Sequence, residues 1–115
     1  MGDFAPEPVI LQLEHMADAI VEMLNEALAA FAEKNTEAAL KVWKRHDEID
    51  KLYHDVATAM QREMEQTPSN VIACIHVVFA AKNLERLADY TTNIAKTVYY
   101  VTSGKRADKG LLKQP

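Results

Sequence analysis

Glycine is nearly absent from this sequence of 115 residues. The glycines are Gly2, Gly104 and Gly110, so residues 3–103 contain none, and a Gly-rich phosphate loop or dinucleotide fingerprint is excluded there. Proline is also scarce, because residues 9–67 contain neither helix breaker. A β domain of this size needs many turn residues. The composition therefore predicts an all-α fold.

Several kinds of chemistry lack their residues. A single cysteine, Cys74, excludes an internal disulfide and a multi-cysteine zinc site. The serines, Ser69 and Ser103, do not stand in a nucleophile elbow, which argues against a serine hydrolase. A formal charge of -4 argues against nucleic-acid binding. The start of the sequence lacks the regions of a signal peptide, and no apolar run is long enough to insert into a membrane.

Two breaks divide the chain into three helices of roughly 25–35 residues. Asn35 or Thr36 is suited to cap a second helix, and Thr67 with Pro68 is suited to begin a third. Gly104 is suited to end the third helix in the left-handed conformation. Short turns make neighbouring helices antiparallel, so residues 1–104 are predicted to form one up-down-up three-helix bundle.

Apolar residues at helical spacing predict which face of each helix enters the core. On the first helix the stripe is Leu13, Ala17, Ile20, Leu24, Ala27 and Phe31. On the second it is Val42, His46, Ile49, Tyr53, Val56 and Met60. On the third it is Ala73, Val77, Ala80, Leu84, Leu87, Thr91, Ile94, Val98 and Val101.

Two further segments stand apart from the predicted core. Apolar residues off the third stripe, namely Ile72, Ile75, Val78 and Phe79, predict a second apolar surface of the kind found at interfaces. Residues 105–115 form a basic tail with four cationic residues against Asp108, a net charge of +3. The tail is interpreted as a solvated end or as a charged docking segment.

Potential ligands cluster at two places. His46, Asp50 and His54 follow one another at intervals of four residues, with Asp47 beside them. The third helix repeats this spacing with Glu85, Asp89 and Asn93. Side chains four residues apart lie on one helix face.

The turn at Pro68 relates the two clusters. Asp50 and Glu85 are each 17 residues from Thr67 and Pro68 respectively, and His46 and Asp89 are each 21 residues from them. An antiparallel hairpin therefore sets Asp50 level with Glu85, and His46 level with Asp89. Carboxylates with imidazoles suit iron, manganese, zinc or nickel. The sequence thus predicts a metal site, with Glu85 and Asp89 facing away from the core.

The same residues have plainer interpretations. Acidic side chains on an outer face are commonly solvated, and Lys82, Arg86 and Lys96 are available as ion-pair partners. His46 also fits a hydrogen-bonded residue at the edge of the core. A di-metal carboxylate enzyme is disfavoured because such bundles use Glu-x-x-His motifs that point inward.

The acidic motif of the third helix resembles the signature of the PhoU family of bacterial phosphate-uptake regulators. The matching residues are Leu84-Glu85-Arg86-Leu87-Ala88-Asp89 and Asn93-Ile94. The segment Asp47–Tyr53 resembles the corresponding helix of the same repeat, and the resemblance covers roughly residues 10–105. PhoU proteins have two such repeats, and this sequence resembles only the second. Ala88 replaces the family's usual glycine.

The resemblance implies a cytoplasmic, homodimeric helical bundle without catalysis. It implies surface metal clusters held by Glu/Asp-x-x-x-Asp motifs, which Glu85 and Asp89 match. His46 replaces the first acid of the other motif, so a bridging carboxylate is lost. The implied partners are the ATPase of a phosphate importer and a membrane sensor kinase, through which phosphate-starvation signalling is held down. The alternative is a general helical oligomerisation or interaction module with a solvated acidic face.

Overall fold

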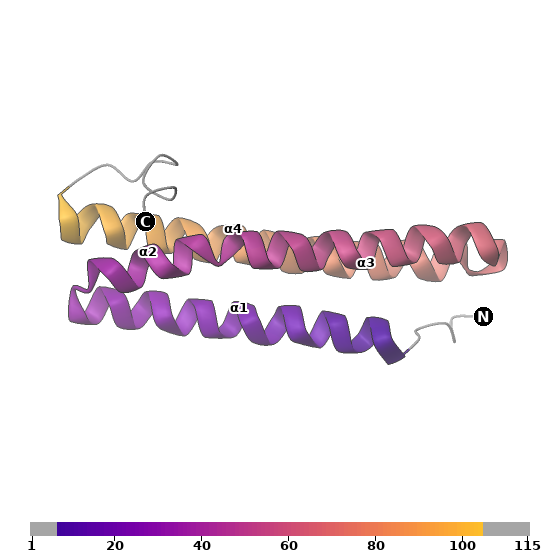
Figure 1. The fold of residues 1–115 in the computed structure, drawn as a ribbon, viewed down its shortest axis with the longest axis horizontal. Coiled ribbons are helices and arrows are strands. Elements are labelled where there is room, and N and C mark those ends of the chain that lie inside the picture. The colour runs from indigo at the N-terminus through magenta and orange to yellow at the C-terminus, as the bar shows by residue number, and fades with distance from the viewer. Residues whose placement is uncertain (1–6, 105–115) are drawn as a thin grey trace.

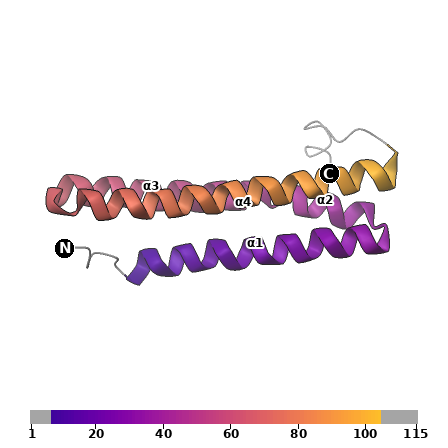
Figure 2. The same cartoon turned by 180° about the vertical axis from the view of Figure 1, so that it is seen from behind.

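The computed structural model describes residues 7–104, which form three antiparallel helical rods (Figure 1). The elements are α1 (Glu7–Glu33), α2 (Thr36–Lys44), α3 (His46–Gln66), a 3-10 turn η1 (Pro68–Asn70) and α4 (Val71–Ser103). Within these residues there is no strand. The rod formed by α2 and α3 returns along α1, and α4 then runs parallel to α1 (Figures 1 and 2). This arrangement confirms the predicted all-α up-down-up bundle.

The breaks predicted at Asn35 and at Thr67–Pro68 are confirmed, and the first has a side-chain cap. The Asn35 side chain accepts a hydrogen bond from the Ala38 amide at 3.0 Å and so caps α2. Just before it, Lys34 adopts a left-handed conformation with φ +55°, which ends α1. Thr67 precedes Pro68 at the start of η1, without a side-chain hydrogen bond to the turn. Gly104 ends α4 with φ +70°, and its amide donates to the Tyr100 carbonyl at 2.9 Å.

The predicted second helix is not continuous, because it breaks at Arg45. The Arg45 backbone has φ -68° and ψ -11°, and its amide is shared between the Lys41 and Val42 carbonyls. That tightened turn ends α2, and α3 begins at His46. Neither glycine nor proline marks this position. The return rod is therefore two helices joined at one residue.

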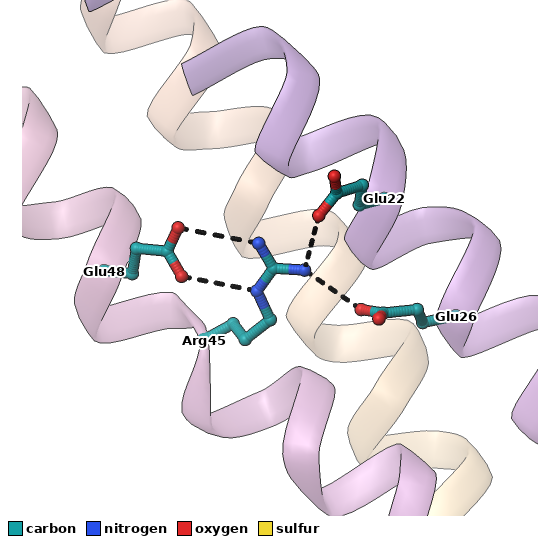
Figure 3. A network of polar contacts seen from close by, with 4 residues as sticks. All are labelled: Glu22, Glu26, Arg45 and Glu48. Atoms are coloured by element: carbon teal, nitrogen blue, oxygen red, sulfur yellow. Dashed lines mark hydrogen bonds and ion pairs between the residues drawn. The ribbon is translucent and has the colours of Figure 1, made fainter. Parts of the chain in front are cut away.

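The Arg45 side chain ties this break to α1 (Figure 3). Its Nη1 atom lies 3.2 Å from a Glu22 carboxylate oxygen and 3.1 Å from one of Glu26, both on α1. Its Nε atom lies 3.3 Å from a carboxylate oxygen of Glu48, on the first turn of α3. One guanidinium thus links three acidic side chains across two rods.

The core combines large side chains from three helices with small ones from α4. The large buried residues include Met16, Met23, Val42, Trp43, Ile49, Val56 and Met60. Along α4 the fully covered positions Cys74, Ala81, Ala88 and Ala95 recur every seven residues. Their short side chains leave room for the larger residues of the other rods, so α4 packs against α1, α2 and α3.

The predicted core stripe is confirmed for the second rod and wrong in part for the other two. Leu24 and Phe31 of α1, and Leu87, Ile94 and Val101 of α4, are exposed. Val9, Met16, Met23 and Ala30 are buried on α1 in their place, and Cys74, Ala81, Glu85, Ala88, Thr92, Ala95 and Tyr99 on α4. Each helix carries two apolar stripes, and one bundle of three rods covers only one of them.

The hairpin of α3 and α4 extends past the start of α1 (Figures 1 and 2). Ile72, Ile75 and Phe79 lie near its turn and are exposed, as the predicted second apolar surface requires, whereas Val78 is partly buried. The basic tail at residues 105–115 lies outside the described residues and stays a prediction.

Candidate functional site between α3 and α4

The hairpin brings His46 and Asp89 into direct contact. His46 is the first residue of α3, and its Nε2 atom lies 2.5 Å from Oδ1 of Asp89 on α4. The two side chains are one third and about half exposed respectively. Counting residues from the turn at Pro68 therefore predicted correctly that His46 and Asp89 lie at the same height along the hairpin. His46 is also hydrogen-bonded at the edge of the core, as its plainer interpretation requires.

Asp50 and His54 form a second, looser pair on α3. The His54 Nε2 atom lies 3.7 Å from Oδ2 of Asp50, and both side chains are well exposed. The His54 ring also stacks edge-on with Tyr53, with centroids 5.6 Å apart. Asp50 follows His46 by four residues, so the two pairs occupy neighbouring turns.

Glu85 corrects the predicted orientation of the acidic face. It is buried, with 8% of its surface exposed, and does not point away from the core. The Lys82 Nζ atom donates to Oε1 of Glu85 at 2.8 Å. That hydrogen bond, together with the Glu85 charge, raises the pKa of Lys82. The Lys82 ammonium also lies 5.1 Å from the centre of the Tyr53 ring. A cation of the protein itself therefore accompanies this carboxylate.

The remaining predicted ligands do not join these pairs. Asp47 is exposed and, among residues 7–104, makes no ion pair. Asn93 lines a groove with Leu28 and Phe31 of α1. Within the described chain, no group of three histidine, cysteine, aspartate or glutamate side chains is arranged to hold a metal ion. The donor atoms are of the types that suit a transition metal. They are arranged, however, as the His46–Asp89 pair, the Asp50–His54 pair and the Glu85 carboxylate bound to Lys82.

One ion pair agrees with the alternative interpretation, in which the acidic face is solvated and neutralised by the protein's own lysine and arginine side chains. Lys82 was available as a partner for the acids, and it pairs with Glu85. Lys96 instead places its ammonium 5.1 Å from the centre of the Trp43 ring on α2. Tyr53 belongs to this face and was assigned only to the core by its spacing. Its place in the site follows from its two contacts, with the Lys82 ammonium on α4 and with the neighbouring His54 ring.

No helix among residues 7–104 has the length and hydropathy needed to cross a membrane.

Comparison with known proteins identifies relatives of the whole described bundle. A family model described as the PhoU domain matches residues 13–98. A phosphate-specific transport system accessory protein PhoU homolog of Rhizobium meliloti is 36% identical over 103 residues. A protein of the same description from Zymomonas mobilis is 37% identical over 106 residues, and one from Caulobacter vibrioides is 32% identical over 93 residues.

These matches cover the chain and the relatives unequally. They include 90%, 92% and 81% of this chain, but 44%, 44% and 40% of the three relatives. The chain thus spans less than half the length of each, consistent with a single repeat. No solved structure matches the chain.

Proposed function

Since the chain belongs to the PhoU family, we propose that it regulates phosphate uptake and phosphate-starvation signalling by binding other proteins, without catalysis. The observation that supports this function is the match of the family model over residues 13–98, which extends across all three rods. The relatives are described as accessory proteins of phosphate-specific transport systems. We place its action in the cytoplasm, as a homodimer.

The proposed partners are the ATPase of a phosphate importer and a membrane-bound sensor kinase. The α3–α4 face offers them a pattern of charge, in which the side chains of Asp89, Asp50 and Lys82 are each about half exposed. Rim charges of this kind set the specificity and the rate of association more than the affinity.

Gene replacement tests the function directly. Deleting the gene from its host is expected to raise expression of a phosphate-starvation reporter in phosphate-rich medium. The wild-type gene should restore repression, and an Asp89→Asn gene should restore it less well than an Asp55→Asn gene. Asp55 is the matched control because it is exposed on α3 and lies outside the candidate site. A reporter that stays repressed after deletion would contradict the proposal.

We further propose that the acidic face takes up a transition metal, with zinc, iron, manganese and nickel as the candidate ions. His46 and Asp89 would supply the first two donors, and Asp50, His54 and Glu85 lie on the neighbouring turns of the same two helices. Asp47 is exposed on the first turn of α3, and Asn93 lines the groove beside α1. Binding through Glu85 requires Lys82 to leave its present hydrogen bond.

Elemental analysis of purified protein tests the metal proposal. His46→Gln and Asp89→Asn should lower the bound metal, whereas Asp55→Asn should not. Equal metal content in all four proteins, or none in any, would reject it. That outcome would favour the second candidate function, a helical interaction module whose acidic face is neutralised by its own cations, as the Lys82–Glu85 pair illustrates.

A further inference from the structure

The Glu85 carboxylate is the most enclosed of the acidic ligands predicted between α3 and α4. Its side chain is 10% exposed, compared with 46% for Asp50 and 54% for Asp89. A carboxylate that loses this much water needs a cation or several hydrogen-bond donors beside it, because burying an unpaired charge is costly. The group that neutralises Glu85 therefore decides whether this carboxylate is available to a metal ion.

Lys82 supplies the neutralising cation from one turn earlier on α4. Its Nζ atom donates to Oε1 of Glu85 at 2.8 Å and lies 5.1 Å from the centre of the Tyr53 ring on α3. A carboxylate and an aromatic ring both attract an ammonium group, so two neighbouring helices hold the same charge. Lys82 thus occupies the place of a positive ion between α3 and α4.

The lysine end of this pair is accessible to water, whereas the glutamate end is enclosed. The Lys82 side chain is 52% exposed, and its ammonium stands at the end of a flexible stem. The ammonium can therefore exchange its hydrogen bond with Glu85 for hydrogen bonds with water. The pair can open by movement of the lysine alone, without unfolding of either helix.

Lys82 and a metal ion require the same oxygen atom. The ammonium donates to Oε1 of Glu85, and two cations on one carboxylate oxygen repel each other where little water separates them. Lys82, Glu85 and Asp89 follow one another at intervals of three and four residues, so they share one face of α4. In this lysine-bound arrangement, no three candidate ligands converge within residues 7–104.

We propose that Lys82 competes with a transition-metal ion for Glu85, so that the Lys82–Glu85 pair opens when the site takes up metal. The inference rests on the metal site proposed above and identifies the residue that sets its affinity. In the metal-free state Lys82 neutralises Glu85 and lies over the Tyr53 ring. In the metal-bound state the Lys82 ammonium moves into water and leaves Glu85 free to act as a ligand.

Zinc titration of two lysine variants measures this competition. Lys82→Met keeps much of the aliphatic stem and removes the ammonium. Lys51→Met is the matched control, because Lys51 is also exposed and makes no ion pair or ring contact within residues 7–104. Isothermal titration calorimetry with Zn²⁺ alone gives the Kd of the wild type and of each variant, and circular dichroism checks that each protein is helical.

We expect Lys82→Met to bind Zn²⁺ about tenfold or more tightly than the wild type, since no hydrogen bond between charged groups has to be broken. Lys51→Met should stay within about twofold of the wild type, because salt screens the loss of an exposed charge. Zinc binding by Lys82→Met alone would also support the competition.

Three other results would overturn the competition. Equal affinity in the wild type and Lys82→Met would do so while leaving the metal site intact. An equal gain in Lys51→Met would show that only the overall charge matters. No zinc binding by any of the three proteins would reject the competition and the metal site together. The elemental analysis of His46→Gln and Asp89→Asn described above tests the metal site by itself.

Nuclear magnetic resonance of the wild-type chain keeps the test decisive if Lys82→Met fails to fold. The Tyr53 ring should shift the signals of the Lys82 ε-methylene protons, because aromatic ring currents alter the field at nearby groups. Lys96 is an internal control, since its Nζ atom lies 5.1 Å from the centre of the Trp43 ring. Saturating Zn²⁺ should move the Lys82 signal toward that of a free lysine and leave the Lys96 signal in place. An unchanged Lys82 signal, or equal shifts of both signals, would refute the competition.

Discussion

Replacing Arg45 by methionine tests whether its ion pairs stabilise the break in the return rod. The substitution keeps most of the aliphatic stem and removes the guanidinium that joins Glu22, Glu26 and Glu48. Exposed ion pairs contribute about 0.2–1 kcal/mol each. The Arg45 side chain is 24% exposed and the carboxylates 44–66%, so three pairs that share one cation should contribute about 1–2 kcal/mol.

The loss should depend on salt, because the carboxylates face solvent. Glu22 and Glu26 are one helical turn apart, so removing Arg45 also leaves two like charges facing each other. The screening length falls from about 10 Å at 0.1 M salt to about 3 Å at 1 M. The stability difference between wild type and Arg45→Met should therefore shrink by about half or more at 1 M NaCl.

Urea unfolding followed by circular dichroism measures this difference, since urea leaves the ionic strength unchanged. Protein concentration is held constant, because self-association would add to the apparent stability. Arg62→Met is the control, as Arg62 is exposed on α3 and forms no ion pair within residues 7–104. A loss below about 0.3 kcal/mol, or one equal at low and high salt, would refute the assigned role of the ion pairs.

Three other substitutions test the backbone, the packing and the buried thiol. Lys34→Gly should raise the free energy of unfolding by about 0.5–1 kcal/mol and Tm by about 3–5 °C, because Lys34 has φ +55°; an unchanged or lower Tm in a thermal scan would contradict this. Ala88→Leu should cost about 1–3 kcal/mol through overpacking, whereas Ala29→Leu on the surface of α1 should be nearly neutral in urea unfolding. Burial, and then the charge of Glu63, raises the pKa of the Cys74 thiol, so its contribution to stability is present below about pH 8.5 and lost as pH rises through the native pKa. The difference in free energy of unfolding between wild type and Cys74→Ala should accordingly become smaller above that pH. A difference that does not change with pH would refute the contribution of thiol ionisation to stability.

The breaks at Asn35 and Pro68, the end of α4 at Gly104 and the level of the site were predictable from the sequence. Asn35, Pro68 and Gly104 each act through local backbone chemistry, which a sequence displays directly. Counting from Pro68 placed His46 level with Asp89 because both helices rise by the same distance per residue.

The inward faces of α1 and α4 were harder to predict, and so was Glu85. Two apolar stripes on one helix fit the same spacing rule, and only tertiary packing selects the buried one. The large side chains Leu24 and Phe31 favoured the wrong stripe on α1, whereas alanines such as Ala88 fill the close contacts of α4. Glu85 is buried on that same alanine side with Lys82 beside it. The break at Arg45 carries no glycine or proline and depends on acids from another rod.

An odd number of rods has a consequence for joining two such bundles in one polypeptide. The start of α1 and the end of α4 lie at opposite poles of a molecule 54 Å long (Figure 1). A tandem unit connected by a short linker would begin at the far pole and travel back beside the first. The second unit would then lie antiparallel to the first, as in a pair related by a two-fold axis. No long crossover connection would be needed to reach this orientation.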